Sequence, residues 1–357
     1  MKARIDSKEF SNVIRQAVRW SAKTGAIASE CIWLKAEGQY LIIRTTTLDQ
    51  DAILTANNFG DEDGEVLTKV SILQEAAIDT GGFVNISRSK SKLVLDYEDF
   101  SRIEIGTVGD DIIGNFPVIL EIEPVVSLNR DTLVAAASHT LPMEKTGLPI
   151  KSAVHIIPNG DQIAIVGTDG IIGYMMNVEG TIEKPLSIGA STLISALMAI
   201  RDLVEIGIGK HRVQVKDMNS PSRIQFSSMQ SPDPSGFIAM FNYKTTGSVK
   251  VSRADLERIR MLCNRSSAID SAAEVKISRE KIEILGQDIE AEMEWNGGDI
   301  LTSYFLAEKL AQALGGLRNA DEYLISTKPH ESGNAHFWYV DAIGRHFIGC
   351  ASPGRFE

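Results

Sequence analysis

The chain has 357 residues, of which 43% are hydrophobic and 23% are charged, so it is long enough for two or three globular domains. No segment approaches the roughly 20 consecutive apolar residues of a membrane-spanning helix. Residues 1–10 lack the apolar stretch of a secretory signal, so we expect a cytoplasmic protein. The formal net charge of −11 would ordinarily argue against nucleic acid as a partner, because phosphate binding requires Lys and Arg.

The three cysteines, Cys31, Cys263 and Cys350, are widely separated in the sequence. An odd number of thiols without short spacings argues against a disulfide framework and favours a reducing compartment. The six histidines form no His-x-x-x-His pattern, and no Cys-x-x-Cys pattern is present. The sequence therefore predicts neither a bound metal nor a cofactor.

The first predicted element is a strand that runs into a polar helix cap, and it occurs three times. The cap candidates are Asp6, Asn129 and Ser252, which are separated by two equal intervals of 123 residues. Side chains of these types accept hydrogen bonds from free N–H groups in the first turn of a helix. An apolar residue follows each cap by four positions: Phe10, Leu133 and Leu256. The constant interval indicates an internal repeat.

Further predicted elements repeat in the same order. A strand, a polar corner and a second strand are expected at 41–54, 163–176 and 282–295, and a strand followed by a helix at 66–78, 186–200 and 300–314. Strands punctuated by two helices indicate α+β domains with antiparallel sheets. We expect three such domains, at 1–124, 125–247 and 248–357. Three tandem domains without a shared task remain the alternative, although triplication of both helices favours a common geometric role.

Positive charge is concentrated in the first helix of each repeat. Residues 7–23, 129–145 and 252–268 together carry ten Lys or Arg and five Asp or Glu, a net +5, so the remaining residues carry −16. A basic surface of this kind within an acidic protein would attract a DNA backbone without reading its sequence. For any single helix taken alone, the simpler interpretation is that its Lys and Arg side chains form an ordinary face exposed to water.

The spacing within these helices separates a core face from a basic face. In the first, Phe10, Val13, Ile14 and Ala17, extended by Val18, have the spacing of a core-facing stripe. The third helix has its stripe at Leu256, Ile259 and Cys263, and the second offers only Arg130 and Lys145 as cations. The candidate DNA-binding residues off these stripes are Arg15, Arg19, Lys23, Lys145, Arg258 and Arg265.

With these repeats and basic helices, the chain resembles the bacterial β sliding clamp family, which also has phage-encoded members. The resemblance covers the whole chain, with two helices in each of three repeats. Ser101–Val108, followed by Asn115-Phe116-Pro117, resembles the end of the family's first domain. Val166–Gly170 resembles its Ala-Thr-Asp-Gly segment, and Pro353–Phe356 resembles its closing Pro-Met-Arg-Leu.

The resemblance implies a ring-forming DNA clamp fold, in which two helices per repeat pack on antiparallel sheets. Such clamps are head-to-tail homodimers whose helices line a central hole around double-stranded DNA. A clamp loader opens the ring, and the DNA polymerase tethers to it. The implied function is that of a processivity factor in DNA replication and not of an enzyme. A tethered polymerase that dissociates stays near its template at high effective concentration.

The family also has a groove that accepts apolar peptides from partner proteins. Carried over to this chain, its walls are Thr168, Gly170, Ile171, Ile172 and Gly173, with Pro353, Gly354, Arg355 and Phe356. The family commonly has His-Arg-Leu where this chain has Ile171–Gly173, and a methionine at the position of Gly354, so the preferred peptide is expected to differ. An ordinary β-turn is the simpler interpretation of Thr168-Asp169-Gly170 taken alone.

The resemblance further places apolar contacts of the dimer interface at Ile103 and Ile105. The matching apolar pair in the third domain is replaced here by Ser266-Ser267, so the ring is expected to close differently or more weakly.

Two rival functions remain. A clamp-like scaffold or decoy would bind replication proteins without encircling DNA, and the basic helix faces argue against it. An enzyme could use Asp169 beside Thr168 as an acid or base. The sequence has no nucleophile elbow, phosphate-binding glycine loop or metal-ligand cluster to support that reading.

Overall fold

The computed structural model describes residues 1–22, 25–99, 101–140, 153–168, 170–200, 203–210, 212–228, 235–317, 320–342 and 344–356. These residues form two compact units. Unit 1 contains Met1–Arg130 and Ile194–Ser228, and unit 2 contains Asp131–Leu193 and Met229–Glu357.

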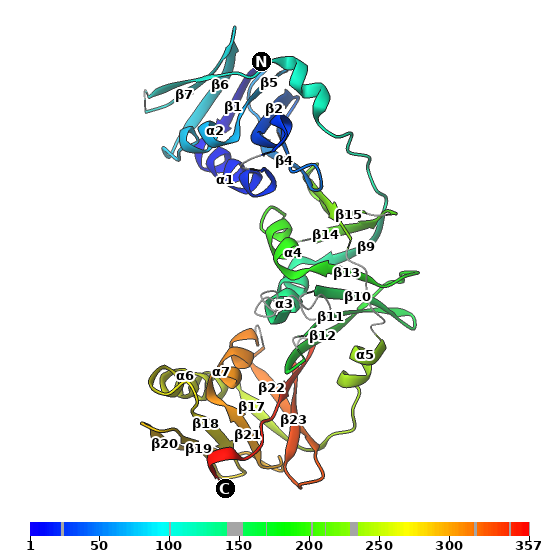
Figure 1. The fold of residues 1–357 in the computed structure, drawn as a ribbon, viewed down its shortest axis with the longest axis vertical. Coiled ribbons are helices and arrows are strands. Elements are labelled where there is room, and N and C mark those ends of the chain that lie inside the picture. Colours follow the sequence, from blue (N-terminus) through cyan, green and yellow to red (C-terminus); the bar gives the residue numbers. More distant parts are fainter. Residues whose placement is uncertain are drawn as a thin grey trace. The chain divides into compact units, whose positions relative to one another are not determined.

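One order of elements, strand, helix, four strands, helix and three strands, occurs three times along the chain (Figure 1). The first series is β1 (Lys2–Asp6), α1 (Ser7–Ala17), β2 (Cys31–Glu37), β3 (Tyr40–Thr46), β4 (Asp51–Asn57), β5 (Gly64–Lys69), α2 (Val70–Ala76), β6 (Phe83–Ser89), β7 (Lys92–Tyr97) and β8 (Arg102–Gly106). The second is β9 (Pro124–Asn129), α3 (Arg130–Thr140), β10 (Ala153–Asn159), β11 (Gln162–Thr168), β12 (Ile172–Glu179), β13 (Leu186–Gly189), α4 (Ala190–Leu197), β14 (Leu203–Ile208), β15 (Arg212–Asp217) and β16 (Arg223–Ser227). The third is β17 (Thr246–Ser252), α6 (Arg253–Ile269), β18 (Glu274–Ile277), β19 (Lys281–Leu285), β20 (Glu290–Glu294), β21 (Ser303–Leu306), α7 (Ala307–Gly316), β22 (Glu322–Pro329), β23 (Ala335–Ala342) and β24 (Gly344–Gly349).

A few shorter elements stand outside this series. The helix α5 (Ser235–Phe241) precedes β17, and 3₁₀ turns form η1 (Val18–Trp20), η2 (Ile27–Glu30), η3 (Asp110–Asn115) and η6 (Gly354–Phe356).

Unit 1 contains two antiparallel sheets. The strand order is β1-β6-β7-β8 in the smaller sheet and β5-β2-β3-β4-β16-β15-β14-β9 in the larger one. The larger sheet joins strands from two repeats through the pairing of β4 with β16, in which Ile53 lies opposite Arg223 and Asp51 lies opposite Gln225. A repeat therefore shares one of its sheets with the next repeat in the chain.

Unit 2 has the same plan. Its larger sheet has the order β13-β10-β11-β12-β24-β23-β22-β17, and its smaller sheet the order β20-β19-β18-β21. The second and third repeats are connected by the pairing of β12 with β24, in which Met175 lies opposite Arg345 and Ile172 lies opposite Ile348. This pairing and that of β4 with β16 are called the internal joints. The α+β class and the antiparallel sheets expected from the sequence are confirmed.

The first and third helix caps form as the sequence predicts. Asp6 accepts a hydrogen bond from the backbone N–H of Glu9 at 2.9 Å, and Ser252 accepts one from Asp255 at 3.2 Å. Such caps each stabilise a helix by about 1 kcal/mol. The first helix is shorter than the predicted 7–23, because its α-helical part ends at Ala17 and continues as the 3₁₀ turn η1.

The apolar stripes of the first helices are buried. Phe10, Ile14 and Ala17 of α1 are fully buried, and so are Ile259 and Cys263 of α6, whereas Val13 and Val18 are half-buried. In unit 2, α6 and α7 lie side by side and contribute to one hydrophobic cluster with the sheets (Figure 1). The opposite faces of α1 and α6 are left to solvent, which is where the cations lie.

Candidate functional site

The cations of α1 and η1 lie on the solvent side of unit 1. Arg15 is exposed and donates hydrogen bonds to the Ser11 carbonyl and the Asn12 side chain, at 3.3 and 2.9 Å. Arg19 is also exposed, and its Nη1 lies 2.7 Å from the Met198 sulfur. Arg15 thus lies in the α-helix and Arg19 in the 3₁₀ turn that continues it, and both are exposed.

The cations of α6 lie on the solvent side of unit 2. The side chain of Arg258 is 67% exposed and lies 3.6 Å from Asp255, and Arg265 is exposed about two turns further along the helix. A surface pair of this kind contributes little to stability, so Arg258 remains available to an external anion. Arg260, which the sequence analysis passed over, is paired with Glu257 at 2.7 Å.

The remaining candidate cations contribute less. Lys23 and Lys145 lie outside the described residues. Arg130, at the start of α3, donates a hydrogen bond from Nε to the Leu197 carbonyl at 2.8 Å, so it links α3 to the end of α4.

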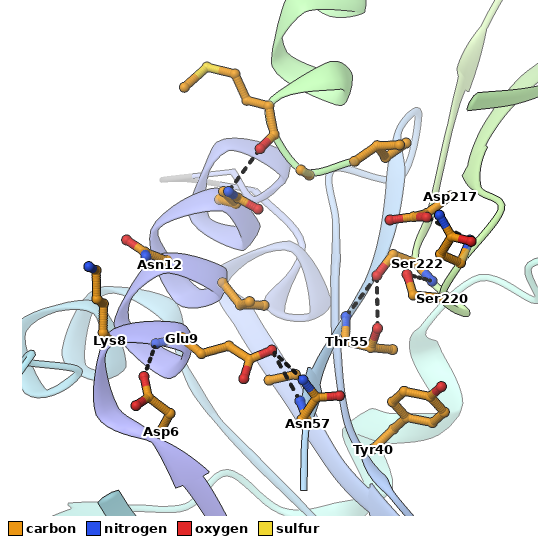
Figure 2. A pocket seen from close by; sticks show the side chains of 17 residues that line it. Asp6, Lys8, Glu9, Asn12, Tyr40, Thr55, Asn57, Asp217, Ser220 and Ser222 are labelled. Atoms are coloured by element: carbon orange, nitrogen blue, oxygen red, sulfur yellow. Dashed lines mark hydrogen bonds between the residues drawn. The ribbon is translucent and has the colours of Figure 1, made fainter. Parts of the chain in front are cut away.

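A polar cleft of about 480 Å³ lies beside α1 in unit 1 (Figure 2). Glu9 points from α1 toward β4, where its carboxylate accepts hydrogen bonds from the backbone and side chain of Asn57. On another wall of the cleft, the Thr55 hydroxyl lies 2.9 Å from the Ser222 hydroxyl of the β15–β16 turn. The first and second repeats therefore both contribute walls to this cleft, which nothing in the sequence analysis predicted.

The corner between β11 and β12 contains the first part of the predicted peptide groove. The Thr168 hydroxyl donates to the Ile172 carbonyl and accepts from the Gly170 N–H, both at 2.9 Å. Gly170 has φ of +89°, a conformation that favours glycine. Asp169 lies outside the described residues. The Thr168 side chain thus links the described residues on both sides of this corner.

The predicted groove residues of this corner differ in exposure. Ile171 is 47% exposed, whereas Ile172 is 2% exposed and packs in the core opposite Ile348. Gly173 lies opposite Phe347, whose ring occupies the space that a side chain at position 173 would need. Of these three residues, Ile171 is the one whose side chain is open to solvent.

The predicted tail residues lie against the smaller sheet of unit 2. The Arg355 N–H donates to Glu274 at 2.6 Å, and its guanidinium lies 3.0 Å from Asp270. The Phe356 ring packs 5.9 Å from that of Tyr304. Gly354 has φ of +53°, and the Glu274 carboxylate lies where its side chain would be. The strand β24, which leads into the tail, is linked to the β11–β12 corner by one hydrogen bond. The Gly349 N–H donates to the Ile171 carbonyl at 2.7 Å.

The predicted interface residues lie on β8, an edge strand of the smaller sheet of unit 1. Ile103 is half-buried, whereas Ile105 is 2% exposed and belongs to the core. Beside them, hydrogen bonds from Lys92 and then Arg102 lower the pKa of Glu104. In the third repeat, Ser266 is buried and its hydroxyl donates to the Leu262 carbonyl at 2.9 Å.

Within the described residues, no group of three or more His, Cys, Asp or Glu side chains is placed to hold a metal ion. None of their helices is long and apolar enough to cross a membrane.

Comparison with solved structures gives the fold a name. The chain superposes on the Helicobacter pylori beta clamp bound to a DNA ligase peptide with a TM-score of 0.77 and 13% identity, covering 99% of this chain and 100% of that one. It superposes equally on the beta subunit of Streptococcus pyogenes DNA polymerase, with a TM-score of 0.77, 13% identity and coverage of 98% and 100%. For the DNA polymerase III beta subunit of Thermotoga maritima the TM-score is 0.73, with 13% identity and coverage of 98% and 99%.

The protein thus has the fold of the bacterial β sliding clamps over its whole length. No protein-family model and no curated protein matches its sequence.

Proposed function

We propose that this protein is a DNA sliding clamp, a processivity factor without enzymatic activity. Two copies, each with clamp domains at 1–124, 125–247 and 248–357, would close head to tail around double-stranded DNA. A clamp loader would place the ring on DNA, and the replicative polymerase would bind to it. The observation that carries this proposal is the way in which successive repeats share sheets.

Within the chain, this sharing happens twice in the same manner. The last strand of a repeat, β16 or β24, pairs with the fourth strand of the repeat before it, β4 or β12. The equivalent strands at the two ends of the series are β8 and β20, and each is an edge strand in the described sheets. An edge strand presents unpaired N–H and C=O groups that can pair with another chain. A β8–β20 pair between two copies would repeat the internal joint and close a ring.

The internal joints also predict the register of this pair. Arg223 and Arg345 hold equivalent places at the start of β16 and β24, opposite Ile53 and Met175. Counting along the strand pairs, the equivalent residues at the ends of the series are Arg102 of β8 and Glu290 of β20. The joint between copies would therefore bring opposite charges together where the internal joints have an arginine facing an apolar side chain.

A cleft on α6 and β20 supports the same arrangement. It is lined by Asp255, Arg258, Met293 and Glu294, which correspond by repeat to Glu9, Asn12, Ala56 and Asn57 of the polar cleft in unit 1. In unit 1 the other wall comes from the next repeat, through residues that include Met198, Ala199, Ile200, Ser220 and Ser222. Among the described residues of the third repeat, α6 has no equivalent of that wall, and the first repeat of a second copy would supply it.

The charge distribution supports DNA as the partner inside the ring. The first helices carry +5 and the rest of the chain −16, and Arg15, Arg19, Arg258 and Arg265 are all exposed. Contacts of cations with phosphates are independent of sequence, so they permit sliding.

Retention on DNA tests the function. Protein loaded on circular DNA should stay bound and should run off after linearisation, whereas direct equilibrium binding should be weak and fall steeply with salt. Equal retention on linear and circular DNA would contradict the proposal and would favour a scaffold that does not encircle DNA.

Charge reversal tests the joint. Arg102→Glu should shift the mass in solution from twice the 39.0 kDa of one chain toward a single chain, and adding Glu290→Arg should restore the dimer. Arg4→Glu is the matched control, because Arg4 is a half-exposed arginine of β1 at the opposite edge of the same sheet. A dimer unaffected by Arg102→Glu, or lost equally in the control, would rule out this register.

A further inference from the structure

A short segment of unit 1, residues 117–123, connects η3 to β9 and lies against the larger sheet, and we call it the strap (Figure 1). Two glutamines hold it there. Gln214 donates to the Ile122 carbonyl at 2.8 Å, and Gln225 donates to the Leu120 carbonyl at 2.5 Å. Both glutamines are almost fully buried, so these bonds are shielded from water. The strap is therefore a fixed part of the fold.

The side-chain amide of Gln214 takes the place of a neighbouring strand. Its Nε2 donates to the Ile122 carbonyl, and its Oε1 accepts from the Ile122 N–H at 3.4 Å, as the backbone of a paired residue would do. Gln214 and Gln225 face each other across β15 and β16, so two carbonyls two residues apart bind one cross-strand pair. This spacing requires an extended backbone between Leu120 and Ile122.

The opposite edge of the strap is unpaired within the described part of the chain. In an extended chain, successive residues direct their backbone groups to opposite sides, so those of Ile119 and Glu121 point away from the two glutamines. Among the described residues, these N–H and C=O groups have no hydrogen-bond partner. The Glu121 carboxylate is held by Lys216 at 2.9 Å, which fixes this edge. Unpaired groups along a fixed, extended segment can pair with a strand of another chain.

The strap also presents apolar side chains to solvent. Val118 is 83% exposed and Leu120 is 73% exposed, the highest values for large apolar side chains among the described residues. They stand two positions apart, the spacing at which side chains share one face of an extended chain. This arrangement is typical of a binding surface, because the backbone that carries the two side chains needs no further ordering when a partner binds.

Charge and length restrict the partner. Residues 103–129 contain five Asp or Glu and no Lys or Arg. Glu123 of the strap is exposed and has no ion-pair partner among the described residues, so a cation on the partner would complement it. Pro117 and Pro124 flank the segment, and proline has no N–H with which to pair. An added strand can therefore pair only between residues 118 and 123.

We propose that the strap binds an extended peptide segment of a partner protein, which adds to its free edge as a β-strand. The backbone of that segment pairs with Ile119 and Glu121, and its apolar side chains at alternate positions pack on Val118 and Leu120. A Lys or Arg of the segment faces Glu123. The site lies in unit 1, shares no residue with the predicted peptide groove and does not depend on ring closure.

Two other occupants fit the strap less well. Nucleic acid is disfavoured because residues 103–129 carry carboxylates and no cation, whereas phosphate binding requires Lys or Arg. A second copy of the chain would place one acidic segment beside another, and such a like-charge arrangement opposes binding.

Subtractive selection from a random dodecapeptide display library tests the proposal. The library is first depleted on Ile119→Pro and then selected on the unmodified full-length protein. Proline fits the φ of an extended chain and removes one N–H of the free edge, while every other surface of the protein is retained. Recovered peptides should carry Val, Ile or Phe at alternate positions, with Lys or Arg beside them and no internal proline. Failure to recover such peptides would overturn the proposal.

A recovered peptide provides the affinity measurement. Its dissociation constant should rise about tenfold on Ile119→Pro, the size expected for loss of one or two backbone hydrogen bonds. The constant should stay unchanged on Ile119→Val, the matched control that keeps the N–H. Methylation of one of the two alternating sets of peptide nitrogens should weaken binding, and methylation of the other set should not. An affinity insensitive to all these changes would mean apolar adhesion without strand pairing, against the proposal.

Amide hydrogen exchange of the full chain locates the contact without a variant. In the free protein, the N–H groups of Ile119 and Glu121 should exchange faster than that of Ile122, which Gln214 binds. The peptide should slow exchange at Ile119 and Glu121, and unchanged exchange there would contradict the proposal. A mass in solution above two chains that falls on Ile119→Pro would do the same, since it would indicate pairing between copies. Retention of Ile119→Pro on circular DNA should equal that of the unmodified protein, so failure of the clamp function would be seen separately.

Discussion

The indole ring of Trp20, at the end of η1, stacks on the ring of Phe226 in β16, with centroids 6.5 Å apart and an angle of 16° between the planes. This contact joins the first helix of one repeat to the last strand of the next within unit 1. Both rings are 2% exposed. It explains why the helix tightens after Ala17, since the 3₁₀ turn carries Trp20 into the core, and the Thr45 hydroxyl binds the Ala17 carbonyl at 3.0 Å.

Removing this contact should destabilise unit 1. Phe226→Ala is expected to lower the free energy of unfolding by about 3–5 kcal/mol, the usual cost of truncating a buried aromatic side chain. Val118→Ala is the control, because Val118 is 83% exposed and its truncation should cost less than about 0.5 kcal/mol. Urea denaturation followed by tryptophan fluorescence measures both, and a loss in Phe226→Ala as small as in the control would contradict the packing.

Charge reversal on the first helices should weaken DNA association without unfolding the protein. Arg15→Glu and Arg258→Glu together should lower the affinity for duplex DNA at low salt and reduce the salt dependence of binding. The melting temperature should change little, because both side chains are exposed. Each single variant is compared with Lys35→Glu, which reverses one half-exposed lysine of β2 and so makes the same change in net charge outside the first helices. A large drop in melting temperature would mean that the arginines are structural.

Deletion of residues 353–357 should abolish binding of polymerase or loader and leave dimerisation intact. The contacts of Arg355 and Phe356 are with Asp270, Glu274 and Tyr304, none of which lies on β8 or β20. A pull-down with full-length and truncated protein measures the first effect, and mass in solution measures the second. Unchanged recovery of partners would refute a role of the tail in partner binding.

The tail should loosen in acid. Backbone N–H groups of Gln287 and Ala272, and then Arg355, hold the pKa of Asp270 below its ordinary value of 3.8. Since the folded pKa is lower than the unfolded one, the stabilisation is present above about pH 3.8 and is lost as the pH falls through the folded pKa. The NMR shift of the Arg355 side chain should therefore titrate with a midpoint below 3.8, and Asp270→Asn should remove the transition. A midpoint at or above 3.8 would contradict the contact.

Much of the fold could be predicted from spacing alone. The interval of 123 residues between Asp6, Asn129 and Ser252 identified the three first helices, because a cap and an apolar stripe are local features. The end of α1 could not be predicted in this way. It depends on the stacking of Trp20 on Phe226, a residue more than 200 positions away in the sequence.

The candidate site was less predictable for the same reason. The resemblance indicated the β11–β12 corner, but it could not tell that Ile172 is buried opposite Ile348, because strand pairing decides which of two neighbouring isoleucines faces solvent.

The joint between β4 and β16 is formed by the same kinds of strands as the one between β12 and β24, and under the proposed function a third joint would form between two chains. Peptide connectivity is then irrelevant to the geometry of a joint. A circular permutant that begins at β9 and carries the first repeat after the third, fused through a linker, should assemble into the same ring with its chain breaks moved by one repeat. The number of chains in such a ring would depend on how many repeats the gene links in one chain, whereas the number of joints would depend on the fold alone.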